Sequence, residues 1–411
     1  MTFSDLKLNS SLLAALPTAL KQPTVIQQHA IPAALNGQDV LGLAQTGSGK
    51  TWAFGLPLLN HSKKGDQSFS SIIIAPTREL AAQIKLTLEE VAQPLGIKSV
   101  LLVGGVEQES QIQSLAEQPQ IIVATPGRLL DLLKNQHIDL SQVERVVLDE
   151  ADRLVDMGFW SDVESILSFV PQPRQTLCFS ATLSKELEAV LTPILNQPQR
   201  IEAQAMNSTV DQVEEQLFLV NKGSKPQVLI WLLKQTLITH NQALVFISAK
   251  DSADTVVKRL NKAGILAAAL HGNKEQTERE VALADFKAGK VQVLVATDVL
   301  ARGVHIDALP LVINYDLPAN AATYVHRVGR TARAGLSGHA VSLVCHAEME
   351  HLNAIRTLTN RALPVLELAE FPVTDKPSTG EARKRPPRDK SANRRTAQKR
   401  SIKQFKKKTD R

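Results

Sequence analysis

The chain of 411 residues lacks the features that mark membrane and disulfide-stabilised proteins. No apolar run approaches the roughly 18 residues that a membrane-spanning helix needs, so we expect no membrane partner. The first residues contain no basic region followed by an apolar stretch, so the sequence predicts no signal peptide. Two cysteines, Cys178 and Cys345, cannot build a disulfide framework and fit buried thiols in a reducing compartment. These absences predict a cytoplasmic protein.

Aromatic residues are also scarce, at 4% of the chain, which is too few for an extended surface that stacks nucleic-acid bases. The content of hydrophobic residues, 43%, and of charged residues, 21%, is that of ordinary globular domains. A chain of 411 residues corresponds to two or three domains, because one domain commonly takes roughly 100–200 residues. Fibrous and wholly disordered classes are therefore excluded.

Positive charge is concentrated at one end of the chain. The net charge is +6, but residues 376–411 hold 15 Lys or Arg and 3 Asp or Glu, a net of +12, which leaves −6 for residues 1–375. After Pro372 apolar residues become rare, so burial cannot offset the entropy lost on ordering this segment. We expect a disordered basic tail. It either binds a polyanion or only keeps the protein dissolved, and the sequence leaves both interpretations open.

Short apolar runs alternate with helical patterns in two series. We expect strands over residues 40–43, 71–75, 99–103, 121–124, 143–148 and 176–179, and again over 216–220, 243–247, 291–296, 311–315 and 340–344. Strands that alternate with helices predict parallel sheets covered on both faces, an α/β fold. The expected organisation is a first domain over residues 1–202, a linker over 203–212, a second domain over 213–365 and the tail over 366–411.

The strongest single motif is the run AQTGSGKT, which follows the first expected strand and precedes a helical pattern. Glycines let successive backbone N–H groups converge on phosphate oxygens, and a helix N-terminus adds positive partial charge. In such a loop Lys50 reaches the β- and γ-phosphates of a nucleotide and Thr51 binds Mg²⁺. Without a ligand, the run would be a glycine-rich turn. The expected nucleotide-binding residues are Ala44, Gln45, Thr46, Gly47, Ser48, Gly49, Lys50 and Thr51.

A second motif, Asp149-Glu150-Ala151-Asp152, follows another apolar strand. Ligands bind at the carboxyl ends of strands in an open parallel sheet. Asp149 there suits Mg²⁺, commonly through water, and Glu150 suits the positioning of an attacking water. By themselves these residues could equally begin a solvated helix, but a phosphate loop in the same domain favours the catalytic interpretation.

Both motifs, with others in the same order, resemble those of the DEAD-box ATP-dependent RNA helicases of the second helicase superfamily. The resemblance runs from about Phe3 to about Val344. It implies two tandem RecA-like domains that use ATP and Mg²⁺ to separate short RNA duplexes or remodel RNA–protein complexes. It also implies that Gln27, in the segment Pro23–Gln27, reads adenine, and that Gly303 lies at the nucleotide.

Several segments resemble the family's RNA-contacting motifs. Helix N-termini and glycine amides bind backbone phosphates without reading bases. Each segment also has a simpler interpretation, as a helix start or a turn. The expected RNA-binding residues are Pro76, Thr77, Arg78, Gly104, Gly105, Thr125, Pro126, Gly127 and Arg128 in the first domain, and Arg279, Thr297 and Asp298 in the second.

The run from His326 to Arg333 carries arginines at 327, 330 and 333, which would lie near one face of a helix. The resemblance implies that Arg330 and Arg333 are arginine fingers on the ATP phosphates, and that Arg327 pairs with Asp152 or a neighbouring carboxylate. Without the family context the run could be a solvated basic helix face. The resemblance also implies a set of residues that couple the ATP state to domain closure: Asp152, Ser180, Thr182, His326 and Arg327. The segment Ser180-Ala181-Thr182 could instead form the N-cap of a helix over 183–195.

Three residues depart from the family pattern. His305 stands where an aspartate usually contacts the ATP ribose, so we expect weakened ATP affinity. Leu20 replaces an aromatic residue near the adenine, although Gln27 keeps an amide that both donates and accepts. Ala332 replaces a glycine.

Two other function classes remain open from sequence. One is an RNA-annealing protein that acts mainly through the basic tail, and the other is a DNA helicase of the same superfamily. The expected partner is RNA, bound largely without sequence preference, and ribosomal or RNA-turnover complexes both fit.

Overall fold

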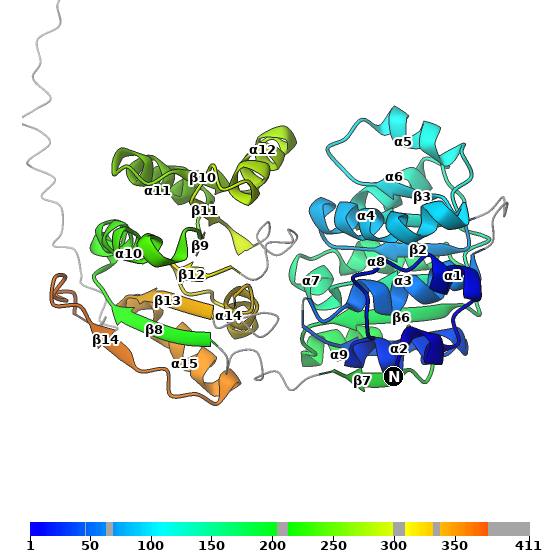
Figure 1. Ribbon diagram of the computed structural model, residues 1–411, viewed down its shortest axis with the longest axis horizontal. Helices are drawn as coiled ribbons and strands as arrows, with labels where there is room; N and C mark the ends of the chain where they lie inside the picture. The colour runs from blue at the N-terminus through cyan, green and yellow to red at the C-terminus, as the bar shows by residue number, and fades with distance from the viewer. Residues whose placement is uncertain (46, 63–68, 204–212, 299–308, 332–337, 377–411) are drawn as a thin grey trace, which may run out of the picture. The chain divides into compact units, whose positions relative to one another are not determined.

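The computed structural model describes residues 1–45, 47–62, 69–203, 213–298, 309–331 and 338–376. Within these residues lie two seven-stranded sheets, and every strand pairing in both is parallel (Figure 1). Strand, helix and strand alternate along the chain, so the α/β fold expected from the sequence is confirmed.

The first sheet has the strand order β3-β4-β2-β5-β6-β1-β7. Its strands are β1 (Val40–Leu43), β2 (Ser71–Ile74), β3 (Ser99–Leu102), β4 (Ile121–Ala124), β5 (Arg145–Leu148), β6 (Gln175–Ser180) and β7 (Gln199–Glu202). The chain before and between them forms η1 (Phe3–Leu6), α1 (Ser10–Ala14), α2 (Val25–Leu35), α3 (Lys50–His61), α4 (Arg78–Leu95), α5 (Gln108–Leu115), α6 (Pro126–Lys134), α7 (Ala151–Asp156), α8 (Trp160–Leu167) and α9 (Lys185–Leu191).

Both faces of the first sheet are buried. Along β2, Ile73 packs into the core formed with α2, α3 and α4, whereas Ile72 and Ile74 pack into the core formed with α6 to α9. Side chains alternate between the two faces of a strand, so a strand covered on both sides reads as an uninterrupted apolar run. This is why the short apolar runs of the sequence predicted these strands.

The second sheet has the strand order β10-β11-β9-β12-β13-β8-β14. Its strands are β8 (Val213–Leu219), β9 (Ala243–Phe246), β10 (Ala267–Leu270), β11 (Val293–Ala296), β12 (Leu311–Asn314), β13 (Gly338–Val344) and β14 (Val365–Glu367). Its helices are η3 (Lys222–Ser224), α10 (Lys225–His240), α11 (Lys250–Lys262), α12 (Gln276–Lys287), α14 (Ala321–Val328), η4 (His346–Glu348) and α15 (Met349–Thr359). Counted from its own first strand, it has the same spatial order as the first sheet.

Three strands were not expected from the sequence. β10 is AAAL, which lacks the β-branched and aromatic residues typical of strands, and β7 and β14 are short edge strands with exposed polar side chains. Edge strands bury little apolar surface, so they leave a weak pattern in the sequence. Each of these strands forms by hydrogen bonding to a neighbouring strand of the sheet, and the sequence pattern does not show that neighbour.

The expected start of the tail at residue 366 needs correction. Leu366 and Glu367 pair with β8, and Phe371 packs edge-on against Trp231 at 5.9 Å between ring centroids. Asn221 then bonds to Thr374 and Asp375. Packing therefore continues to Asp375, because Leu368 and Phe371 join the hydrophobic core of the second sheet. Of the expected linker, the structure describes only Ala203. The tail after residue 376 also lies outside the described residues.

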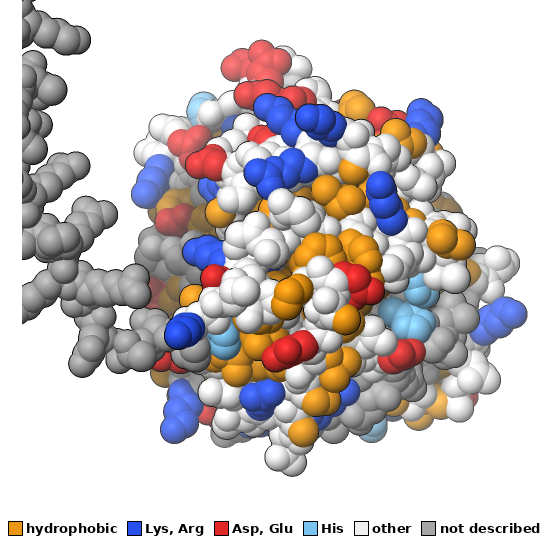
Figure 2. Space-filling view, turned by 90° about the vertical axis from the view of Figure 1, so that its left-hand side faces the viewer, with side chains coloured by type: hydrophobic (Ala, Val, Ile, Leu, Met, Phe, Trp, Pro, Cys, Tyr) orange, Lys and Arg blue, Asp and Glu red, His pale blue; other side chains and the backbone are white. Residues whose placement is uncertain are grey.

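The described surface does not present one broad basic face on the side shown in Figure 2, where Lys and Arg are interspersed with Asp and Glu around a group of hydrophobic side chains. None of the described helices is long and apolar enough to cross a membrane. Cys178 and Cys345 are buried free thiols, as the sequence predicted.

Candidate active site and nucleic-acid interface

The phosphate loop follows β1, the strand that lies between β6 and β7 in the sheet. It begins at the carboxyl end of β1 and ends where α3 starts at Lys50. Gly47 and Gly49 have φ of 80° and 91°, which non-glycine residues rarely adopt. A Cβ on Gly49 would also lie 2.3 Å from Nε2 of Gln27. Ala44, where the strict motif has glycine, extends the sheet by donating its N–H to the Ser180 carbonyl at 2.9 Å. Alanine therefore suits this position.

Lys50 is buried, with 6% of its surface exposed. Its Nζ has no hydrogen-bond partner among the residues that the structure describes. Burying an ammonium group without bonded acceptors is costly unless a ligand supplies them. The position of Lys50 at the first turn of α3, with glycine amides before it, fits a phosphate group.

Gln27 connects the segment before the phosphate loop to the loop itself. It is 1% exposed on α2, where its Oε1 accepts from the Thr24 N–H at 3.0 Å and its Nε2 donates to the Gly49 carbonyl at 3.0 Å. The amide therefore also stabilises the helix start and the loop, which the sequence did not reveal. Leu20 packs against the neighbouring hydrophobic core. Adenine contact by Gln27 stays a prediction.

Two adjacent carboxylates follow β5. Asp149 is 3% exposed, and burial raises its pKa to about 6 although Lys50 opposes the shift. Glu150 is 5% exposed; burial by itself would raise its pKa, but the charges of Arg153 and Lys50 outweigh burial and hold the pKa below its ordinary value. The two neighbouring groups therefore have opposite electrostatic environments. Oppositely shifted carboxylates in one site are typical of catalytic centres.

Glu150 has an unusual backbone and a close cation. Its φ and ψ are 48° and 54°, a left-handed conformation, and it precedes the first residue of α7. Arg153, one turn further on, donates from NH1 to Oε2 of Glu150 at 2.8 Å. Left-handed non-glycine residues are uncommon and concentrate at functional sites.

The expected coupling residues of the first sheet do lie together. The Thr182 N–H and hydroxyl donate to Oδ2 of Asp152 at 3.1 and 2.9 Å, and the Asp152 N–H donates to the Ser180 hydroxyl at 3.3 Å. The alternative role of Ser180 as a helix cap is wrong, because Ser184 caps α9 by accepting from the Leu187 N–H. The ends of β5 and β6 are thus joined through one carboxylate.

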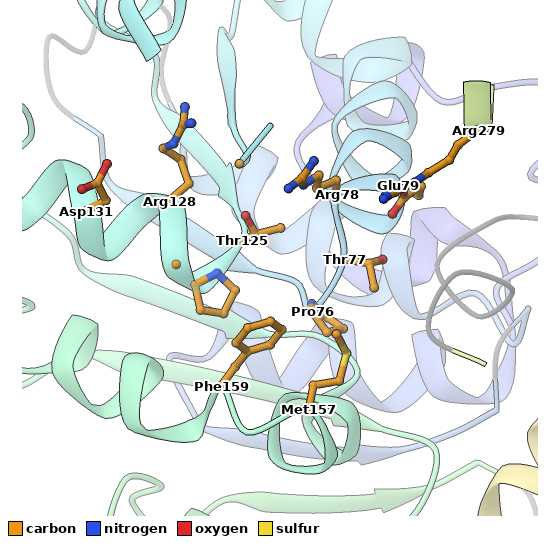
Figure 3. A pocket seen from close by; sticks show the side chains of 13 residues that line it. Pro76, Thr77, Arg78, Glu79, Thr125, Arg128, Asp131, Met157, Phe159 and Arg279 are labelled. Carbon is orange, nitrogen blue, oxygen red and sulfur yellow. The ribbon is translucent and has the colours of Figure 1, made fainter. Parts of the chain in front are cut away.

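A pocket of about 450 Å³ lies beside the carboxyl ends of β2, β3 and β4 (Figure 3). Arg78 opens α4, and Arg128 lies in the first turn of α6. Most of the residues predicted to bind RNA line this pocket: Pro76, Thr77, Arg78, Gly104, Thr125, Pro126, Gly127, Arg128 and Arg279. Gly105 is adjacent, with φ of 74°. The structure therefore brings together segments that are far apart in the sequence.

Glu79 of the motif segment that begins at Pro76 also lines the pocket, and sequence reasoning missed three further lining residues: Asp131, Met157 and Phe159. Met157 and Phe159 flank Gly158, whose φ is 75°, in the turn between α7 and α8. A glycine between two apolar residues just after a short helix was the available signal. These side chains give the pocket an apolar wall opposite its arginines (Figure 3).

Replacing Gly105 with alanine is expected to weaken binding of single-stranded RNA about 10-fold, through loss of one charge-assisted contact. A Cβ there would lie 1.9 Å from NH1 of Arg78, so the guanidinium must move. Fluorescence anisotropy with a labelled RNA and a non-hydrolysable ATP analogue measures the affinity. Gly289→Ala is the matched control, because Gly289 has the same φ of 74° and its Cβ would meet nothing within 4 Å. Equal effects of both substitutions would contradict this role of Gly105.

In the second sheet, Arg327 is fully buried on α14. Its Nε and NH2 donate to the two oxygens of Asp298 at 2.6 and 2.8 Å, and NH1 donates to Oδ1 of Asn314 and to the Asp316 carbonyl. The carboxylate partner of Arg327 is therefore Asp298, whereas the sequence left Asp152 or a neighbour open. The sequence predicted that Asp298 contacts RNA. In the structure both oxygens of its carboxylate accept hydrogen bonds from Arg327, and RNA contact stays a prediction.

The expectation that all three arginines share one helix is wrong. α14 ends at Val328, Gly329 forms its C-cap, and Arg330 lies beyond it, 3% exposed. The helix ends here because Gly329 forms its C-cap and the backbone of Thr331 forms a β-bridge with Leu309.

Three other expected residues of the second domain lie on or next to three different elements. His326 lies on α14, and Thr297 is buried directly after β11. Arg279 lies on α12 and donates to the Lys274 and Gly272 carbonyls.

Some expected site residues lie outside the described part of the chain. They are Thr46, Gly303 and Arg333, together with the two departures His305 and Ala332.

Comparison with known proteins identifies the family. The model of the DEAD/DEAH box helicase family matches residues 24–190, and the helicase conserved C-terminal domain matches residues 224–335. The ATP-dependent rRNA helicase RRP3 of Kluyveromyces lactis is 42% identical over 366 residues, covering 88% of this chain and 75% of that protein. The chain belongs to the DEAD-box helicases. RRP3 of Saccharomyces cerevisiae is 41% identical, with 88% of this chain and 73% of that protein covered.

Solved DEAD-box structures share the fold of this helicase. S. cerevisiae Dbp5 bound to RNA and ADP BeF3 is 32% identical, with a TM-score of 0.80 over 89% of this chain and 95% of that chain. Mss116p bound to ssRNA and AMP-PNP is 27% identical, with a TM-score of 0.80 over 89% of this chain and 79% of that chain. The two parallel sheets are thus tandem RecA-like domains, as expected. The protein is an ATP-dependent RNA helicase, and neither the annealing protein nor the DNA helicase is favoured.

Proposed function

We propose that the first sheet binds ATP at the carboxyl end of β1 and that Glu150 orients the attacking water. The observation that carries this proposal is the buried Lys50 ammonium, which has no hydrogen-bond partner among the described residues and lies near Asp149 and Glu150. Lys50 binds the β- and γ-phosphates, and the amides of Gly47, Ser48 and Gly49 surround them.

The oxygen donors near Lys50 fit Mg²⁺. Thr51 lies in the first turn of α3 and Asp149 at the end of β5, whereas no group of three or more His, Cys, Asp or Glu residues in the described part of the chain could hold a metal by itself. Mg²⁺ keeps several waters and commonly takes only one or two protein ligands together with substrate phosphates. When bound, it would offset the negative charge that develops on the phosphates.

Arg330 and Arg333 are proposed to complete the site from the second domain. The clamp of Arg327 on Asp298 joins α14 to the end of β11 and so sets the position from which Arg330 extends. ATP and RNA each favour the arrangement in which both domains contribute, so their affinities are coupled reciprocally. The proposed domains are residues 1–202 and 213–375, joined by 203–212, with the end of the second domain moved from 365 because packing continues to Asp375.

RNA is proposed to lie along the pocket of Arg78 and Arg128, where helix N-termini and glycine amides contact its backbone. Such contacts do not read bases, so sequence preference is weak. Two relatives carry the name ATP-dependent rRNA helicase, which favours ribosomal RNA as the substrate of this protein. A cytoplasmic location stays a prediction.

The decisive measurement compares ATP hydrolysis with single-stranded RNA and single-stranded DNA of the same sequence. We expect strong stimulation by RNA only, because 2′-hydroxyl contacts distinguish the two, and none with Lys50→Ala. A labelled short RNA duplex provides the unwinding assay. Equal stimulation by DNA would contradict the proposed RNA specificity.

A second measurement separates the contribution of the two helicase domains from that of the basic tail. A chain ending at Asp375 loses a net charge of +12, so its RNA affinity should depend less on salt, while hydrolysis at saturating RNA remains. Binding isotherms at several salt concentrations and the maximal rate test both parts. If truncation abolished hydrolysis at saturating RNA, the tail would be part of the catalytic machinery.

A further inference from the structure

Glu150 needs external support for its side chain. Its backbone is left-handed at the junction of β5 and α7, and its side chain is 6% exposed with three rotatable bonds. A residue that orients a water must hold one carboxylate oxygen in a defined place, since small misplacements of a reacting group slow catalysis strongly. The backbone at this junction does not by itself select a rotamer of the glutamate.

Arg153 supplies a direct contact. Its NH1 donates to Oε2 of Glu150 at 2.8 Å, and the two side chains are 4% and 6% exposed. Glu150 is the N-cap residue of α7 and Arg153 lies in the first turn of that helix, so the start of α7 brings the guanidinium close to the carboxylate. The backbone of Arg153 is held in turn, because its main-chain N–H donates to Oδ1 of Asp152 at 3.0 Å.

The helix that carries Arg153 is anchored at the site. The other oxygen of Asp152 accepts from the N–H and hydroxyl of Thr182, at the end of β6. The path from β6 through Asp152 to Arg153 and Glu150 is therefore short, buried and continuous. This gives Arg153 a fixed place from which to orient the glutamate.

We propose that Arg153 is a positioning residue for ATP hydrolysis, which binds Oε2 of Glu150 and so aims Oε1 at the attacking water. The inference rests on the proposed role of Glu150. Arg153 does not touch ATP in this assignment and acts only through the glutamate. A purely structural ion pair would instead support the folding of α7 without selective influence on the rate.

The test compares Arg153→Met, which keeps the side-chain stem, with Arg153→Gln and Arg153→Lys. We expect Arg153→Met to lower the RNA-stimulated kcat about 10- to 100-fold through misplacement of the carboxylate, with KM for ATP within about twofold. Arg153→Lys should restore part of kcat, because a cation again reaches Oε2. Titration with a fluorescent ADP analogue should show unchanged affinity, and thermal unfolding reports on stability.

A double-mutant cycle with Glu150→Gln decides between positioning and structure. If Arg153 acts through Glu150, adding Arg153→Met to Glu150→Gln causes no further loss of kcat. Lys85→Met is the control, because it removes another cation from an ion pair within a helix, with Glu89 on α4. The inference would be overturned if the fold-losses of kcat from the two substitutions multiplied in the double mutant, or if Arg153→Met and Arg153→Gln both kept a normal kcat. Either result would leave the proposed role of Glu150 intact. A normal kcat in Glu150→Gln itself would instead overturn the proposed role of Glu150 and the inference with it.

Discussion

Lys50→Ala is expected to lower RNA-stimulated ATP hydrolysis by at least about 100-fold, the loss typical of removing one group that stabilises developing charge. The reason is structural as well as chemical. Nζ of Lys50 is buried beside Asp149 and Glu150 and has no hydrogen-bond partner among the described residues. A coupled assay of ATP turnover at saturating RNA measures the effect.

The same substitution removes no hydrogen bond of Nζ among the described residues, so any loss of stability of the empty protein would come from the weaker compensation of the Asp149 and Glu150 charges. Thermal unfolding without nucleotide therefore separates a binding role from a folding role. Lys85→Ala is the control, because Lys85 is a lysine that pairs with Glu89 on α4, away from the phosphate loop. Retention of normal turnover by Lys50→Ala would exclude this loop as the ATP site.

Arg330→Ala is expected to lower the RNA-stimulated kcat by about 10³-fold or more, as for other arginine fingers. Arg330 is 3% exposed just beyond α14, and the bonds of Arg327 to Asp298 fix the preceding turn. Its substitution leaves the phosphate loop intact, so nucleotide binding to the first domain should persist. Single-turnover hydrolysis and equilibrium binding of an ADP analogue measure the two quantities separately.

Arg259→Ala is the matched control in the second domain, since Arg259 is an exposed arginine on α11. It should hydrolyse ATP at the wild-type rate. Wild-type kcat in Arg330→Ala would show that this arginine does not reach the transferred phosphate. Equal losses of kcat and of ADP affinity would point to a folding defect rather than to loss of a finger.

The motif residues were predictable because each depends on local chemistry. The phosphate loop needs glycines at the two positions with φ of 80° and 91°, and it needs a helix that starts at Lys50. Residues next to one another in the sequence meet both requirements, so the motif could be identified without the fold. The central strands were predictable for a related reason. A strand buried on both faces is mostly or wholly apolar, as the three isoleucines of β2 and all four residues of β4 show.

Several features of the site could not be inferred from sequence. Arg327 pairs with Asp298, 29 residues earlier, and Phe159 joins a pocket formed mainly by α4 and α6. The helix over the three arginines was predicted from spacing, but glycine at 329 and the pairing of Thr331 with Leu309 end it early. Local spacing does not report which side chains the packed sheet brings near one another.

Neighbouring residues along the chain are enough to specify the α/β class, the order of the motifs and the separation of a basic end from an acidic body. These depend on composition, periodicity and short-range backbone requirements, which neighbouring residues specify. The shared strand order of the two sheets, the partner of Arg327 and the contact of Arg153 with Glu150 emerge only from the packed fold. Those features depend on which strand ends lie side by side and on how deeply each charge is buried, and burial exists only once the chain has packed.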